Sequence, residues 1–261
     1  MDRKIQFIIS GFYFDKHSDG EYLQSLKYLE DENDNISVFW SCHAEPPKSI
    51  KDGGNFIINE NVGFEWGAYR KAIDHLIYQL EDDTILFLMH DDLLIKDWSF
   101  INQCIKMLDS GVKIIGNGAN YSMENFNPYD EARLSYWLKT KDRYIDYVEE
   151  ENKHFYNEIL LVKSIRGSFI CTKLNHLNEI GGLEYVKKGS PGIDTDVPDV
   201  EGVIGNGRYQ SFGNTSLYLN AYKFTKIFGH DKIKYLSPYY CVSDYIIERP
   251  EEEENPKLVG G

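Results

Sequence analysis

Three residues with side chains able to bind a metal ion, His90, Asp91 and Asp92, follow directly after the apolar run at residues 85–89. The run has the length and composition of a buried strand. Adjacent carboxylates raise each other's proton affinity and reduce stability unless a cation, a basic side chain or solvent neutralises them. Paired carboxylates at a strand end suit Mg²⁺ or Mn²⁺, which take oxygen ligands and leave positions for diphosphate oxygens. His90 is then either a further ligand or a hydrogen-bond donor to phosphate.

Polar residues also follow three earlier apolar runs of the chain. They lie at residues 10–12, 41–45 and 59–63. Ligands of mostly parallel sheets bind at the carboxyl ends of the strands. If these runs are parallel strands of one sheet, the three clusters and the carboxylates meet at a single edge.

Strand-like runs alternate with helix-like segments over the first half of the chain. The strand-like runs are residues 4–10, 36–41, 55–58, 84–89 and 112–116. Helical spacing of apolar residues follows residue 67, and a final helix is expected at 215–228, with further strands near 234–236 and 242–247. This alternation predicts an α/β fold, a single domain with a mostly parallel central sheet and helices on both faces. We expect the domain to span residues 1–248, and residues 249–261 to form an acidic, disordered tail.

The composition excludes several classes of partner. The net charge of −14 disfavours binding to nucleic acid or to anionic membranes. No apolar run approaches the roughly 20 residues of a membrane-spanning helix, and we expect a cytoplasmic protein. The four cysteines are widely spaced, as in a protein with reduced thiols.

Three segments, in matching order, resemble those of GT-A glycosyltransferases, particularly the GT2-like group. FLMHDDLLIKDW (residues 87–98) is similar to the DxD-type segment, and NENVGFEWGAYRKAI (59–73) to the N-x-G…GA segment. RGSFICTKLNHLNEIGGLE (166–184) resembles the strand–helix–GG segment beside the acceptor. Within that group, the sequences of these segments are most similar to those of enzymes of rhamnan and related polysaccharide assembly. The resemblance implies the GT-A (Rossmann-like) form of the α/β fold.

The resemblance implies a role for each matching residue at the donor site. Asp92 matches the metal-binding last acid of DxD, while His90 stands in place of the first Asp and leaves Asp91 as a substitute ligand. The residues that match positions around the nucleotide and its diphosphate are Ser10, Gly11, Phe12, Asn61, Gly63 and Arg70. Independently of the resemblance, a guanidinium binds phosphate bidentately, although a solvated helix arginine explains Arg70 equally well. Glu45 is a candidate acceptor of a hydrogen bond from the base or the ribose.

The expected catalytic base is missing from its usual place. The GT2-like group carries an acidic pair before the last helix, where this chain has Gly213 and Asn214. An Asn amide cannot take the proton of an acceptor hydroxyl. The nearby acids are Asp194, Asp196, Asp199 and Glu201, of which we favour Asp199 or Glu201. His230 is either a C-terminal metal ligand, as in some GT-A enzymes, or an ordinary surface histidine.

The resemblance implies an enzyme that moves a sugar from a nucleotide-sugar donor to a hydroxyl of a saccharide or glycan acceptor. It implies dependence on Mn²⁺ or Mg²⁺ and inversion at the anomeric carbon. One alternative is a catalytically silent nucleotide-sugar-binding module, which Asn214 favours. A nucleotidyltransferase usually has a Gly-rich basic loop after its first strand, which SGFYFDKHSDG lacks. A His–Asp phosphohydrolase needs several further His and Asp ligands.

Overall fold

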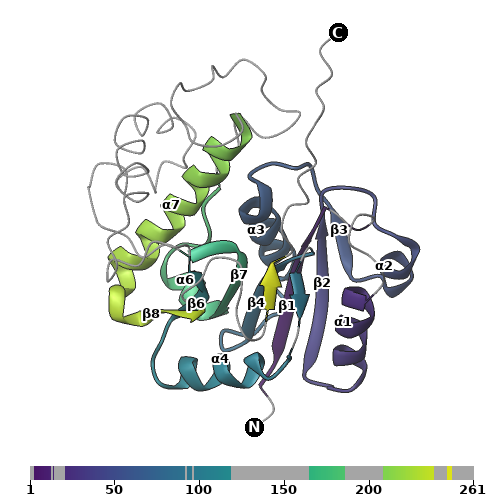
Figure 1. The fold of residues 1–261 in the computed structure, drawn as a ribbon, viewed down its shortest axis with the longest axis horizontal. Helices are drawn as coiled ribbons and strands as arrows, with labels where there is room; N and C mark the ends of the chain where they lie inside the picture. Colours follow the sequence, from purple (N-terminus) through teal and green to yellow (C-terminus); the bar gives the residue numbers. More distant parts are fainter. Residues whose placement is uncertain are drawn as a thin grey trace.

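The computed structural model describes residues 3–12, 14, 21–91, 93–95, 97–118, 165–185, 208–237 and 246–248. A seven-stranded sheet with the order β3-β2-β1-β4-β7-β6-β8 forms its centre (Figure 1). The strands are β1 (Ile5–Gly11), β2 (Ile36–Cys42), β3 (Phe56–Ile58), β4 (Ile85–His90), β6 (Ile114–Gly118), β7 (Ile165–Lys173) and β8 (Ile233–Ser237). A separate antiparallel pair joins β5 (Leu93–Ile95) to β9 (Ile246–Glu248).

All strands of the large sheet except β7 run in one direction. β1 pairs in parallel with β2 and β4, β2 with β3, and β6 with β8, whereas β7 is antiparallel to both β4 and β6. One edge of the sheet, here called the carboxyl edge, therefore holds the carboxyl ends of the parallel strands and the amino end of β7. The opposite edge is called the amino edge. The predicted mostly parallel α/β sheet is confirmed; the reversed direction of β7 was not predicted.

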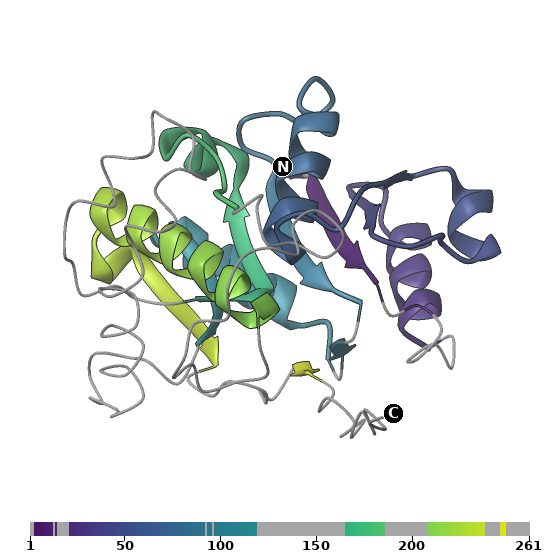
Figure 2. The same cartoon turned by 90° about the horizontal axis from the view of Figure 1, so that it is seen from above.

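Helices cover both faces of the sheet, as predicted. On one face α1 (Glu21–Asp31), α2 (Lys48–Gly53) and α4 (Phe100–Asp109) contribute to one buried cluster. On the other, α3 (Phe64–Leu76), α6 (Leu174–Glu179) and α7 (Arg208–Phe228) contribute to a second. Figure 1 shows α1 and α2 beside β2 and β3, and α7 near β6 and β8; Figure 2 shows the same order from above.

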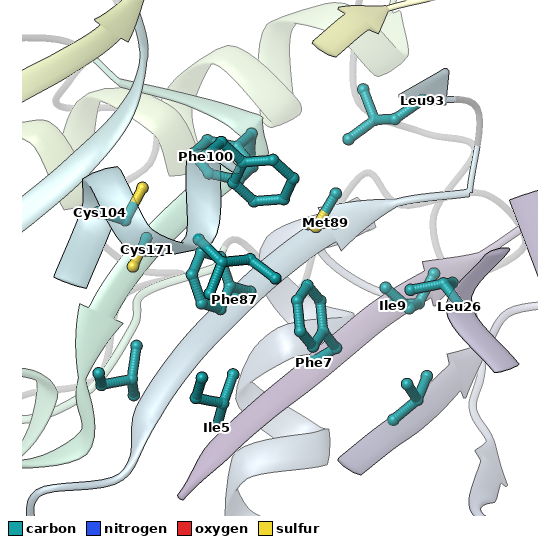
Figure 3. Packing of buried hydrophobic residues seen from close by; sticks show 14 of the residues in the cluster. Ile5, Phe7, Ile9, Leu26, Phe87, Met89, Leu93, Phe100, Cys104 and Cys171 are labelled. Atoms are coloured by element: carbon teal, nitrogen blue, oxygen red, sulfur yellow. The ribbon is translucent and has the colours of Figure 1, made fainter. Parts of the chain in front are cut away.

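The central strands are apolar throughout because both of their faces are buried. On β1, Phe7 and Ile9 pack in the α4-side cluster while Ile8 packs in the α3-side cluster, as the alternation of side chains along a strand requires. Phe7 stacks on Phe87 of β4 with ring centroids 4.8 Å apart (Figure 3). This packing supports the parallel register of β1 with β4, in which Ser10 lies opposite His90.

Two helices differ from the prediction. α2 was not predicted; it begins directly after Pro47, whose φ of −63° is also that of a helix. α7 begins at Arg208, so Gly213 and Asn214 lie inside it rather than before it. In the described part of the chain, none of the helices combines the length and apolar character needed to cross a bilayer.

Candidate functional site

The ends of the first strands meet at the carboxyl edge as expected. Ser10 pairs with Ser41 on one side and with His90 on the other. Cys42, the last residue of β2, pairs with Ile58, the last residue of β3. The polar residues after β1, β2, β3 and β4 therefore start from neighbouring positions on one edge.

Asp91 joins the end of β4 to the end of β1. Its Oδ2 accepts a hydrogen bond of 2.8 Å from the backbone N–H of Phe12, and its side chain is buried. A hydrogen bond to a charged acceptor is roughly twice as strong as one between neutral groups. The Phe14 ring packs directly on Gly11, because a Cβ on Gly11 would lie 2.2 Å from Phe14 Cζ. The predicted closeness of the first of the paired carboxylates to residues 11 and 12 is therefore observed.

The loop after β3 is tied to β2 and to α3 through Ser41. The Ser41 hydroxyl donates to the carbonyl of Ala68 at 2.9 Å and accepts from Asn59 Nδ2 at 2.6 Å. Ser41 is completely buried, so each of these bonds satisfies a group that water cannot reach. This arrangement fixes the start of the 59–63 loop above the sheet.

His43 connects the same loop to β1. Its backbone N–H donates to the carbonyl of Gly11 at 2.8 Å, and its Nε2 lies 3.2 Å from the carbonyl of Phe64, which requires the proton on Nε2. Burial lowers the pKa of His43 to about 4, although the carbonyl of Phe64 opposes the shift. His43 is therefore neutral at pH 7. Burial, with the charges of Asp91 and Glu45, raises the pKa of the neighbouring Cys42 to about 12.

α3 begins at the carboxyl edge through a loop that only glycine permits. Gly63 has a φ of +79°, and a Cβ there would lie 2.4 Å from the Tyr185 ring. A Cβ on Gly67 would lie 1.8 Å from the carbonyl oxygen of Val62. The first N–H groups of a helix lack intrahelical partners and favour negative charge. The N-terminus of α3 therefore offers anion-binding groups at this edge.

Several buried polar atoms at the carboxyl edge make no hydrogen bond within the described part of the chain. They are His43 Nδ1, Asn61 Oδ1, Trp66 Nε1, Asn117 Oδ1 and Ser168 Oγ. Buried polar groups are nearly always paired, so such exceptions commonly mark places where a ligand or water binds. Their position, at strand ends and in the first turn of α3, makes this edge a candidate binding site.

Three of these residues, Trp66, Asn117 and Ser168, lie outside the clusters that the sequence analysis predicted. Asn117 lies near the carboxyl end of β6, so the strand-end rule, extended to this strand, would have found it. Ser168 lies near the amino end of β7, and it reaches this edge only because β7 is antiparallel to β4. Periodicity does not report strand direction, so the apolar pattern gives no signal for Ser168, although the residue lies in the segment 166–184 that resembles the one beside the acceptor.

Arg70 and Glu45 make contacts other than those expected of donor-binding residues. Arg70 Nε is 3.0 Å from both carboxylate oxygens of Asp74, and Nη1 contacts the carbonyls of Leu183 at 3.2 Å and Gly181 at 3.4 Å. Arg70 lies about 9 Å along the helix axis from Phe64, at 1.5 Å per residue. Glu45 is exposed and pairs with Lys51.

His230 lies at the amino edge, away from Asp91. It begins the short helix η3 (His230–Lys232), which precedes the first residue of β8. The N–H of Lys113, directly before β6, donates to the carbonyl of Lys232 at 2.8 Å. β8 has 5 residues. A strand of that length spans about 16 Å, so one cation cannot contact both His230 and Asp91. The predicted metal role of His230 does not fit this placement.

Several predicted residues lie outside the described part of the chain. They are Asp92, Asp194, Asp196, Asp199, Glu201 and the tail at 249–261. Asn61 and Gly63 lie in the loop that leads into α3, and Ser10, Gly11, Phe12, His90 and Asp91 lie at the ends of β1 and β4. The described residues that were predicted to bind the donor therefore lie at one edge, apart from Arg70 and Glu45.

The described residues contain no group of three or more His, Cys, Asp or Glu side chains that could hold a metal ion. Mg²⁺ in nucleotide sites is usually held by one or two carboxylates together with phosphate oxygens. A carboxylate has about four lone-pair positions, so the bond from Phe12 does not prevent Asp91 from binding a cation. The donor set at the end of β4 is therefore chemically compatible with Mg²⁺ or Mn²⁺.

A search against protein-family models finds no match to the chain, and a search of curated proteins finds no significant match. Support for a function therefore comes from the residues and contacts at the carboxyl edge.

Proposed function

We propose that the protein is a divalent-metal-dependent glycosyltransferase of GT-A fold that moves a sugar from a nucleotide-sugar donor to a hydroxyl of a saccharide or glycan acceptor. The observation that carries this proposal is the hydrogen bond between Asp91 and the backbone of Phe12. It holds Asp91 against the end of β1, at the edge where ligands of parallel α/β sheets bind.

The same edge offers the groups that a nucleotide sugar requires. The N-terminus of α3 attracts a diphosphate through its backbone N–H groups and helix dipole. The unpaired polar atoms of His43, Asn61, Asn117 and Ser168 suit a ligand with many hydroxyl and amide groups. A bound donor would then supply hydrogen bonds that these atoms lack within the described chain.

Asp91 and Asp92 would hold the cation, with His90 beside them. The cation would stabilise the negative charge that develops on the departing nucleoside diphosphate. Asp91 has a second function that needs no metal, because its bond to Phe12 orients the backbone at the end of β1.

The acceptor hydroxyl must lose a proton as it attacks the anomeric carbon, and in-line attack inverts the configuration there. We keep Asp199 or Glu201 as the proposed base. This choice depends on their acidic side chains and on their nearness in the sequence to Gly213 and Asn214.

A thermal-shift screen of nucleotide sugars, with and without Mn²⁺, tests the proposal, because a bound donor raises the apparent stability by mass action. The donor that binds is then assayed for transfer. Asp92→Ala should abolish metal-dependent turnover and leave the fold intact. Asp83→Ala, an exposed carboxylate just before β4 at the amino edge, is the matched control and should retain turnover. No donor binding, or full turnover by Asp92→Ala, contradicts the proposal.

A catalytically silent nucleotide-sugar-binding module is the second candidate, favoured by Asn214 at the place of the usual acid. Its signature is donor binding by calorimetry without turnover or donor hydrolysis across an acceptor panel. A nucleotidyltransferase would release pyrophosphate, whereas sugar transfer releases a nucleoside diphosphate.

A further inference from the structure

A buried ion pair lies outside the candidate site, on the α3 side of the sheet. Lys223 of α7 and Glu184 are 2.9 Å apart, and their side chains are 0% and 4% exposed. Lys223 also donates to the carbonyl of Gly182 at 2.9 Å. Asn220, one turn earlier on α7, accepts from the N–H of Glu184 at 2.9 Å and donates to its carbonyl at 2.7 Å. We call Glu184, Asn220 and Lys223 the turn anchor.

The anchored turn is also held from α3. Gly181 and Gly182 end α6 with φ values of +76° and +86°. The guanidinium of Arg70 contacts the carbonyls of Gly181 and Leu183, and a Cβ on Gly182 would lie 2.5 Å from its Nη1. The backbone of residues 181–184 is thus fixed by side chains of α3 and α7.

Tyr185, the next residue, connects the anchored turn to the candidate site. Its ring lies directly on the first turn of α3: Cβ atoms on Gly63 and Gly67 would be 2.4 Å and 3.4 Å from Tyr185 Cδ2. Gly63 ends the loop that contains Asn61, and it caps the N-terminus of α3. A shift of the anchored turn would therefore displace Tyr185 and loosen the end of the 59–63 loop at Gly63, while Asn59 stays bound to Ser41.

Stability alone does not account for the turn anchor. Replacement of a buried ion pair by apolar side chains of similar volume is often neutral or stabilising, so such a pair is weak evidence for a stabilising role. A charged, fully paired contact does, however, accept only a narrow range of geometries, whereas apolar packing accepts many.

We propose that Glu184, Asn220 and Lys223 are positioning residues that, through Tyr185, hold the 59–63 loop and the N-terminus of α3 in place for ligand binding at the carboxyl edge. The effect on nucleotide-sugar affinity rests on the proposed function. The effect on the loop itself does not.

The test separates positioning from stability with the double variant Glu184→Leu/Lys223→Met in the full chain. Both charges are removed, so its Tm should stay close to that of the unaltered protein. We expect amide hydrogen exchange of residues 59–67 to become roughly tenfold faster and the Kd of the screened nucleotide sugar to rise about tenfold. Leu108→Ala on α4, on the other face, is the control: it lowers the Tm but leaves exchange at 59–67 unchanged.

Unchanged exchange and unchanged donor affinity in a folded double variant overturn the proposal. If the double variant does not fold, Tyr185→Ala must accelerate exchange at the same amides, and unchanged exchange there overturns it as well. Faster exchange in the variant, in a protein that binds no nucleotide sugar even unaltered, supports the anchor and contradicts the proposed function.

Discussion

The carboxyl edge and the turn anchor are both buried and polar, but they differ in how their hydrogen-bonding groups are used. At the anchor, Lys223, Asn220 and Glu184 satisfy one another and the backbone of the turn. At the carboxyl edge, atoms such as Asn117 Oδ1 and Ser168 Oγ have no partner in the described chain.

The difference separates polar groups that build the fold from polar groups kept for a ligand. A satisfied network restricts the backbone, whereas an unsatisfied buried atom reduces stability until something binds it. Removal of one partner of the anchor should therefore lower stability, whereas removal of an unsatisfied atom at the edge should weaken ligand binding with little change in stability.

The largest effect is expected from breaking the anchor on one side only. Lys223→Met should lower the free energy of unfolding by about 3 to 5 kcal/mol, because it removes the ion-pair partner of the buried Glu184 carboxylate. Urea denaturation measures the loss. Lys27→Met, which breaks an exposed pair with Asp31, is the matched control and should change stability by less than about 1 kcal/mol. A loss as small as that of the control would show that Glu184 reaches solvent.

This contrast also marks what the sequence could predict. Apolar runs and helical spacing predicted the sheet and the meeting of Ser10, Ser41 and His90 at one edge, because periodicity is a local signal and the carboxyl ends of parallel strands lie at the same edge. The pairing of Glu184 with Lys223 joins residues far apart in the chain, and nothing in their neighbours indicates burial. Long-range contacts of charged residues depend on packing that the local pattern does not contain.

Position within an element was the second limit on prediction. Arg70 and His230 have suitable side chains for phosphate or metal, but Arg70 lies well down α3 and His230 precedes β8 at the amino edge. Ser168 was missed because β7 runs against its neighbours. Residue type alone does not say where in the fold a side chain lies.

A smaller effect is expected from the contact that links the two regions. Gly63→Ala should lower the free energy of unfolding for two reasons. A left-handed alanine costs about 1 to 2 kcal/mol, and overlap of its Cβ with the Tyr185 ring costs about 1 to 3 kcal/mol more. Gly54→Ala has the same strain, at a φ of +72°, but open space around its Cβ. Denaturation of the two variants isolates the overlap, and donor affinity should fall for Gly63→Ala alone. Equal losses of stability would show that the Tyr185 ring does not lie on Gly63.

The smallest change in stability, and the sharpest test of the comparison, comes from two buried hydroxyls on β7. Thr172 Oγ1 donates to the carbonyl of Lys113 at 2.8 Å, whereas Ser168 Oγ has no partner in the described chain. Thr172→Val should cost about 1 kcal/mol, the usual value of a hydrogen bond, while Ser168→Ala should change stability by less than about 0.5 kcal/mol or increase it. Ligand affinity should show the reverse order, with weaker donor binding for Ser168→Ala and unchanged binding for Thr172→Val. Urea denaturation of the two variants measures the order of their stabilities, and calorimetry measures the order of their donor affinities. If Ser168→Ala is the more destabilising variant and binds the donor normally, its hydroxyl serves the fold, and the carboxyl edge does not differ from the anchor in the way inferred.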